Sequence, residues 1–149
     1  MALVRLKKVS FSALVLAILL IRPAQAQEAK VKIHITVNEG KVLTATVADN
    51  QTARDFLSLL PLTIKMDDLF GREKYGHLAK PLSNKSDRSN TCEVGQIVYW
   101  SPGPDIAIYY RQDGDKIPSP GVIVIGRMNS GVEALDVSGS VEVKIELAK

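Results

Sequence analysis

The chain has 149 residues, of which 46% are hydrophobic and 23% charged, and it contains one cysteine and two histidines. Its formal net charge of +3 arises in the first 26 residues, which hold four basic residues and no acidic one. The other 123 residues hold 15 lysines and arginines against 16 aspartates and glutamates. Without a basic excess or a cluster of basic residues, we expect no nucleic-acid binding. A single cysteine excludes an intramolecular disulfide.

Residues 1–26 have the three parts of a secretory signal peptide. Basic residues open the segment, residues 11–21 form an uncharged apolar run, and Ala24-Gln25-Ala26 fits a small-x-small cleavage site. An uncleaved anchor is the alternative, but this run is shorter than the roughly 20 residues of a spanning helix. We expect cleavage after Ala26, a periplasmic or secreted product that begins at Gln27, and no membrane attachment after cleavage.

The first part of the mature chain predicts a hairpin and then a helix. Apolar and polar residues alternate over 32–37, the turn-forming residues 38–40 follow, and a second apolar-rich segment covers 42–47. In the helix that follows, Thr52 is the expected cap, and apolar residues recur at helical spacing from Ala53 to Leu60. We expect Pro61 to end this helix.

The rest of the chain predicts one short strand, a long loop and then several strands. Leu62 to Met66 reads as a strand, whereas residues 67–90 show no sustained period and are expected to form a surface loop. The later strands are expected over four segments, with a helical turn over Val132 to Leu135: 96–100, 106–110, 122–128 and 141–147. About seven strands and one good helix predict a single-domain, mainly β protein with a closed or nearly closed barrel.

No arrangement of residues in the sequence indicates a metal or cofactor. His34 and His77 lie in different predicted elements, and no Cys/His set has metal-ligand spacing. Asp67, Asp68, Glu73 and His77 include hard cation ligands, but solvated loop charge is the favoured interpretation.

Cys92 and the aromatic residues each leave alternatives open. For Cys92, a small half-buried side chain is favoured over a nucleophile or an intermolecular disulfide. Tyr99, Trp100, Tyr109 and Tyr110 form an aromatic group, for which cross-strand packing is favoured and a ligand-contacting face is the alternative.

Two segments of the chain resemble cyclophilins. Residues 31–40 with the strand that follows, and then Thr52-Ala53-x-x-Phe56-x-x-Leu59, resemble the opening hairpin and first helix of that family. Residues 122–135 are similar to its late strand, glycine-arginine step and short helix. The middle, with Glu73-Lys74, residues 95–103 and residues 106–110, resembles a smaller bacterial and archaeal group, the cyclophilin-like fold proteins. This resemblance implies a closed eight-stranded barrel over residues 27–149, with one clear helix and a short C-terminal helical turn.

The departures from cyclophilins concern the catalytic residues. The segment Leu62-Thr63-Ile64-Lys65-Met66 has no arginine where the family carries its catalytic one, nothing matches the Gln-Gly-Gly-Asp-Phe strand, and residues 117–121 supply neither Trp nor His. Only the Tyr109-Tyr110 pair corresponds to the phenylalanines of the proline pocket. A lysine such as Lys65 is a flexible point charge and not a rigid fork.

We therefore predict a non-catalytic module that binds a peptide segment or a small molecule, without a cofactor, on the outer face of the barrel and its 67–90 loop. The alternatives are a weak prolyl isomerase, an unrelated enzyme built on Arg72, Glu73 and His77, and a purely structural interaction domain. Seven residues are the candidate ligand-binding set: Lys65, Arg72, Glu73, Tyr75, Trp100, Tyr109 and Tyr110.

The signal-peptide interpretation predicts that protein expressed with its leader is recovered without residues 1–26. Intact mass spectrometry of the purified product should show a chain that begins at Gln27, because a small-residue site follows the short apolar run. Recovery of the full-length chain in the membrane fraction would contradict cleavage.

Overall fold

The computed structural model of this chain describes Leu3 and residues 30–149. Apart from Leu3, the predicted signal peptide lies outside the described residues. Within the described part of the chain, no helix has the length and apolar character needed to cross a membrane.

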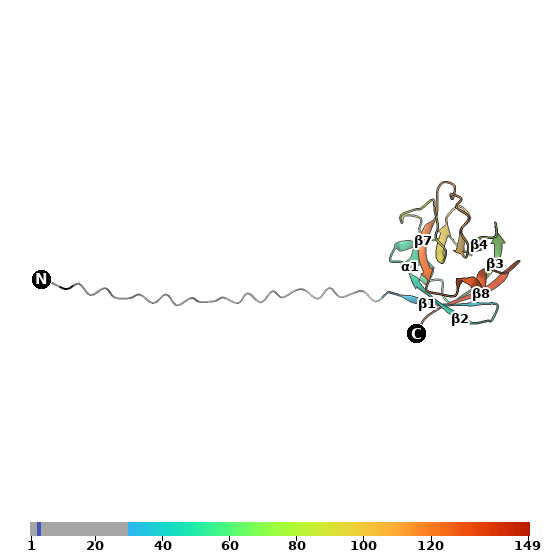
Figure 1. Cartoon of the computed structure of the whole chain (residues 1–149), viewed down its shortest axis with the longest axis horizontal. Coiled ribbons are helices and arrows are strands. Elements are labelled where there is room, and N and C mark those ends of the chain that lie inside the picture. Colours follow the sequence, from blue (N-terminus) through green and yellow to red (C-terminus); the bar gives the residue numbers. More distant parts are fainter. Residues whose placement is uncertain (1–2, 4–29) are drawn as a thin grey trace.

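Eight antiparallel strands form a closed barrel, with the spatial order β1-β2-β7-β5-β6-β4-β3-β8 and β8 paired back onto β1 (Figure 1). The strands have the following bounds: β1 Lys32–Val37, β2 Val42–Val47, β3 Leu62–Leu69, β4 Glu73–His77, β5 Gln96–Trp100, β6 Asp105–Tyr109, β7 Ile123–Met128 and β8 Val141–Leu147. The mainly β, closed-barrel prediction is confirmed. Closure leaves no strand of the barrel with a free edge.

The first hairpin, formed by β1 and β2, follows the alternation of apolar and polar residues in its sequence. In β1, Ile33, Ile35 and Val37 are buried and the intervening side chains are half-buried or exposed. Asn38 and Glu39 adopt positive φ angles of 48° and 55°, the conformation of a tight hairpin turn. The predicted first hairpin is confirmed.

The helix α1, Gln51–Leu57, begins and ends earlier than its sequence suggested. Asn50, not Thr52, is the N-cap, and its side chain accepts a hydrogen bond of 2.9 Å from the Ala53 amide. Thr52 is fully buried, and its hydroxyl donates to the carbonyl of Ser83. Asparagine and threonine both cap helices, so the sequence alone does not distinguish Asn50 from Thr52. The hydrogen bond of Thr52 to Ser83 takes its hydroxyl away from the helix end. Phe56 packs into the barrel core, as its place on the apolar stripe predicts.

The prediction of a single long loop over residues 67–90 is wrong. β3 continues to Leu69, residues 70–72 form the turn, and β4 pairs with β3 from Glu73 onward. The apolar alternation ends after Met66 because the next inward positions carry the polar side chains Asp68 and Lys74.

The second half of the barrel matches its prediction closely. The hairpin of β5 and β6 and the 3-10 turn η1, Val132–Leu135, form as predicted. Between β5 and β7, Ile97 pairs with Gly126 and Val98 pairs with Val124. Ile125 is therefore the extra residue of a β-bulge in β7. A Cβ atom on Gly126 would lie 3.0 Å from the carbonyl oxygen of Thr46. This close approach of two backbones is the role expected of a glycine inside an apolar strand.

Lys74 is enclosed in the structure, with 0% of its side chain exposed. Its ammonium donates to the Asp68 carboxylate at 2.7 Å and to the carbonyls of Val137 and Gly139 at 2.6 and 2.7 Å. The Tyr110 hydroxyl donates to the same carboxylate at 2.6 Å. These bonds to Lys74 and Tyr110 lower the pKa of Asp68. The network joins the β3–β4 hairpin to the segment between η1 and β8.

Asp68→Asn is expected to lower the free energy of unfolding by at least about 3 kcal/mol at neutral pH, because it leaves a buried ammonium without its counter-charge. A carboxyl group with a lowered pKa stabilises the fold above its ordinary pKa, and that contribution is lost as the pH falls. The difference between wild type and variant should therefore shrink below about pH 4. Urea titrations across pH measure it. The exposed neighbour Asp67→Asn is the control, and an equal loss in both variants would contradict the role of the buried pair.

Candidate functional site

The outer face of β4, β6 and β5 carries three cross-strand rows of side chains. Glu73 pairs with Tyr109, and Tyr75 pairs with Ala107, which in turn pairs with Val98 on β5. The third row contains His77, Asp105 and Trp100. Ala107 has the smallest side chain of the middle row, so the outer face is recessed at its centre.

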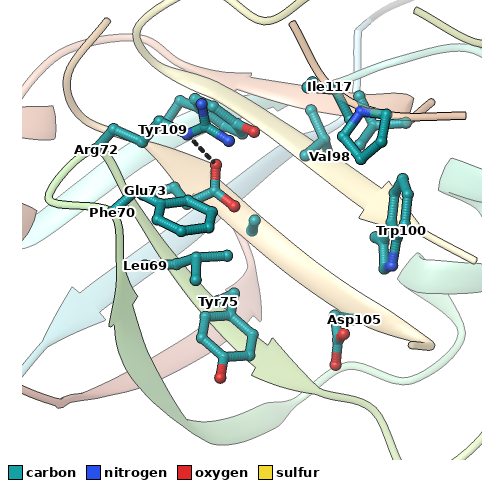
Figure 2. Close-up of a pocket in the computed structure, with 13 residues that line it drawn as sticks. Leu69, Phe70, Arg72, Glu73, Tyr75, Val98, Trp100, Asp105, Tyr109 and Ile117 are labelled. Carbon is teal, nitrogen blue, oxygen red and sulfur yellow. Dashed lines mark hydrogen bonds and ion pairs between the residues drawn. The ribbon is translucent and has the colours of Figure 1, made fainter. Parts of the chain in front are cut away.

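A pocket of about 290 Å³ lies over this recess. Figure 2 shows its walls: apolar side chains on the strands, Phe70 from the β3–β4 turn, and Ile117 from the segment after β6. The lining residues are Leu69, Phe70, Arg72, Glu73, Tyr75, Val98, Trp100, Asp105, Ala107, Tyr109, Ile117, Pro118 and Val122. Several of them form a second apolar cluster outside the barrel core.

Residues 111–121 cover one side of the pocket and are held in place by backbone contacts. The Ile117 amide donates to the carbonyl of Asn90 at 2.8 Å, and the Gln112 side chain donates to the carbonyl of Cys92. Ser89 and Val122 form a two-way bridge. Both segments border the pocket: residues 69–75, within the predicted 67–90 loop, supply five lining residues, and the 111–121 segment adds Ile117 and Pro118.

Arg72 forms the polar wall of the pocket, with only 9% of its side chain exposed. Its Nε donates to the Glu73 carboxylate at 3.2 Å, and its NH1 donates to both oxygens of Asp113 at 3.2 and 3.0 Å. The guanidinium also stacks 5.2 Å from the ring centre of Phe70 and 5.6 Å from that of Tyr109. Such contacts hold a buried guanidinium in a single orientation.

The Phe70 ring reaches this position through an uncommon backbone conformation. Phe70 and Gly71 have φ angles of 56° and 63°, and the Arg72 amide donates to the carbonyl of Leu69, which closes a β-turn with these two residues at its centre. Asparagine and glycine usually occupy such positive-φ positions, since a larger L residue is strained there. Phe70 is nevertheless 75% exposed at the rim of the pocket.

The titratable groups on the inner side of the pocket are shifted by burial. Burial raises the pKa of the Glu73 carboxyl, against the opposing effects of Tyr109 and Arg72. Burial and the neighbouring Glu73 raise the pKa of the Tyr109 hydroxyl. Cys92 is more buried than its sequence suggested, and burial raises the pKa of its thiol to about 11. A protonated thiol is a poor nucleophile.

The mouth of the pocket contains aromatic rings and one carboxylate. Trp100 lies directly opposite Asp105 on the neighbouring strand, and Tyr75 lies one row away (Figure 2). His77 Nδ1 is 3.0 Å from Asp105 Oδ1. A Cβ atom on Gly103 would lie only 1.8 Å from Asp105 Oδ2. The glycine of the β5–β6 turn thus leaves room for this carboxylate.

The structure brings together five of the seven candidate residues proposed from the sequence. They line the pocket: Arg72, Glu73, Tyr75, Trp100 and Tyr109. Lys65 lies in a neighbouring cleft with 74% of its side chain exposed, paired with Asp67 at 3.9 Å. Tyr110 faces the barrel core and donates to Asp68.

Sequence reasoning missed Phe70, Asp105 and Asp113. The alternation of β6 places Asp105 on the same face as Ala107 and Tyr109, so strand periodicity contained a signal for it. Phe70 gave no such signal, since its neighbours read as loop, and Asp113 meets Arg72 across 41 residues of sequence.

The residues considered for a cation do not converge. Asp68 bonds Lys74, Glu73 bonds Arg72, and His77 bonds Asp105. Among the residues that the structure describes, no group of three or more His, Cys, Asp or Glu side chains has an arrangement suited to a metal ion.

Comparisons with known proteins identify the family and show solved structures with the same fold. A comparison with curated proteins found no match. Among solved structures, the hypothetical protein AF2241 from Archaeoglobus fulgidus is similar, with a TM-score of 0.64 and 23% identity over 80% of this chain and 95% of that chain. McbB in complex with tryptophan is similar with a TM-score of 0.55 and 14% identity, over 76% of this chain and 44% of that chain. At these identities both show a shared fold. A model of the Cyclophilin-like family matches residues 35–146, and the chain therefore belongs to the cyclophilin-like family.

Proposed function

We propose that this protein is a non-catalytic binding module that holds a small molecule in the outer-face pocket. The observation that carries the proposal is the pocket itself, in which apolar walls surround the recess at Ala107 and a buried Arg72–Glu73 pair forms one end. Mostly apolar walls with a few fixed polar groups are typical of small-molecule sites. Every strand that contributes a wall residue is part of the closed barrel, so the site is preorganised.

The volume of the pocket favours a compact ligand. About 290 Å³ is at the lower end of ligand-binding pockets, which suits one ring-bearing molecule or one side chain of a bound peptide. McbB, which shares the fold at low identity, was solved in complex with tryptophan. A small aromatic molecule in a protein of this fold supports the same size class of ligand here. In our proposal the protein works in the periplasm or outside the cell, after removal of residues 1–26.

A non-catalytic role is supported by the way in which the polar groups are occupied. Arg72 is bound on both sides by carboxylates, and the Cys92 thiol stays protonated in its buried position. A group that must activate a substrate needs a free lone pair or proton aimed at the reacting atom. Because its Nε and NH1 groups already donate to Glu73 and Asp113, Arg72 is better suited to a structural role in the pocket wall than to a role in catalysis.

Weak prolyl isomerisation is the alternative, and one observation favours it. Arg72 stands beside apolar walls, although the sequence position that corresponds to the arginine of cyclophilins has none. Isomerisation needs a donor directed at the prolyl nitrogen next to a dry wall. The contacts of Arg72 with Glu73 and Asp113 engage its Nε and NH1 groups, and Lys65 lies outside the pocket.

Filling the recess should abolish binding. We expect the neutral probe 2-phenylethanol to bind in the millimolar range and to change the fluorescence of Trp100, the sole tryptophan of the chain. Ala107→Leu should weaken this binding by at least about tenfold, because the added side chain occupies the ligand's space. Ala134→Leu, at an exposed position in η1, is the control. Unchanged affinity in Ala107→Leu, or no binding to wild type, would contradict the pocket proposal.

The purified protein should not accelerate cis/trans isomerisation of an Ala-Pro test peptide to the level of a cyclophilin assayed in parallel. The reason is that the Nε and NH1 donors of Arg72 are already bound, and an exposed lysine lacks the bidentate geometry of an arginine. Exchange spectroscopy by NMR measures the rate without a coupled protease. Substantial catalysis that disappears in Arg72→Ala or Lys65→Ala would establish the isomerase instead.

A further inference from the structure

We infer that the pocket selects an organic cation, with the apolar body of the ligand over Ala107 and its ammonium group at Asp105, between Tyr75 and Trp100. This inference rests on the proposed function and adds the chemical class of the ligand.

The first argument is the charge of the pocket lining. Arg72 is the only Lys or Arg side chain in the lining, and Glu73 and Asp113 already pair with it. Asp105 is then left as a second lining carboxylate. In the described part of the chain its only ion-pair partner is His77, whose side chain is 66% exposed. An anionic ligand would meet this carboxylate without compensation, whereas a cationic ligand would gain an ion pair.

The second argument is the set of aromatic rings around that carboxylate. Trp100 is the direct cross-strand neighbour of Asp105, and such neighbours have Cβ atoms about 4.5–5.5 Å apart. Tyr75 on β4 lies one row away, opposite Ala107, and lines the same pocket. Cations are attracted to the faces of tryptophan and tyrosine rings within about 6 Å. Rings beside a carboxylate therefore suit an ammonium group better than a neutral hydroxyl.

The third argument is the position of Asp105 at the boundary between two clefts. Asp105 and Tyr75 line both this pocket and the neighbouring, more polar cleft that contains Lys65 and Asp67. Asp105 is 20% exposed, so a cation bound there keeps part of its hydration while the apolar body of the ligand is buried. This avoids most of the cost of burying a charge. Gly103 leaves the space that the carboxylate needs in this orientation.

The test compares three phenyl probes that differ in charge: phenethylammonium, 2-phenylethanol and 3-phenylpropionate. Trp100 fluorescence, excited where phenyl groups do not absorb, reports each affinity at about pH 8, where a primary aliphatic amine is protonated. We expect the ammonium probe to bind about tenfold more tightly than the alcohol, through its ion pair and its contacts with the rings. The carboxylate probe should bind most weakly.

Two variants identify the groups responsible. Asp105→Asn should remove the preference for the ammonium and leave the affinity for the alcohol within about twofold of wild type, because the apolar walls are intact. Gly103→Ala, which displaces the carboxylate, should reduce the same preference. Asp67→Asn, an exposed carboxylate on the same face, should keep it. Thermal melts confirm that each variant is folded.

The failures of the two proposals are distinguishable. Equal affinity for ammonium and alcohol, or a preference that survives Asp105→Asn, would overturn the cation inference and leave the pocket proposal standing. Tighter binding of the carboxylate probe would also overturn it. Absence of binding by all three probes would contradict the proposed function and this inference together.

Discussion

The buried ammonium of Lys74 joins the β3–β4 hairpin to the segment before β8, and the residues that line the pocket follow from its inward orientation. Successive side chains of a strand point to opposite faces, so an inward Lys74 requires Glu73 and Tyr75 to point outward, where they line the pocket. The ammonium is bonded by one carboxylate and two carbonyls, and a buried charge needs this degree of compensation. The same pair defines the register of the β3–β4 hairpin and attaches the segment before β8. One buried cation thus positions two of the five candidate residues that line the pocket.

The barrel has two apolar clusters with different roles. The inner cluster contains most of the buried aliphatic residues, including Ile33, Ile35 and Ile145, and it stabilises the closed sheet. The outer cluster is smaller and gathers around Tyr109, Cys92 and Ile117 under the 111–121 segment. The 111–121 segment borders the outer face on one side, so that part of the face is a pocket. The closed barrel beneath keeps the pocket rigid. In our proposal, binding uses the outer cluster, so changes there can alter affinity with little effect on the inner core.

The polar end and the mouth of the pocket differ in how their charges are satisfied. Arg72 has two carboxylate partners, which engage its Nε and NH1 groups, and two stacked rings. Asp105 has one exposed histidine partner. A ligand gains little by competing for donors that two carboxylates already engage and more by pairing with a carboxylate that has one exposed partner, because each new bond must repay desolvation. The chemistry available for recognition therefore lies at the mouth.

Most strands of the barrel could be predicted from local patterns in the sequence. The hairpin of β1 and β2, the turn between β5 and β6, the break at Gly126 and the strand β8 follow from local periodicity and turn chemistry, which act between residues close in sequence.

Which polar residues turn inward, and which segments surround the pocket, could not be predicted because both depend on contacts between residues far apart in the sequence. Asp68 and Lys74 read as loop because an ion pair takes the place of apolar residues in the strand pattern. Asp113, one partner of Arg72, and Val137, one acceptor of the Lys74 ammonium, lie 41 and 63 residues away in the sequence. Such contacts leave no local period in the sequence, since they depend on where closure of the barrel brings distant segments together.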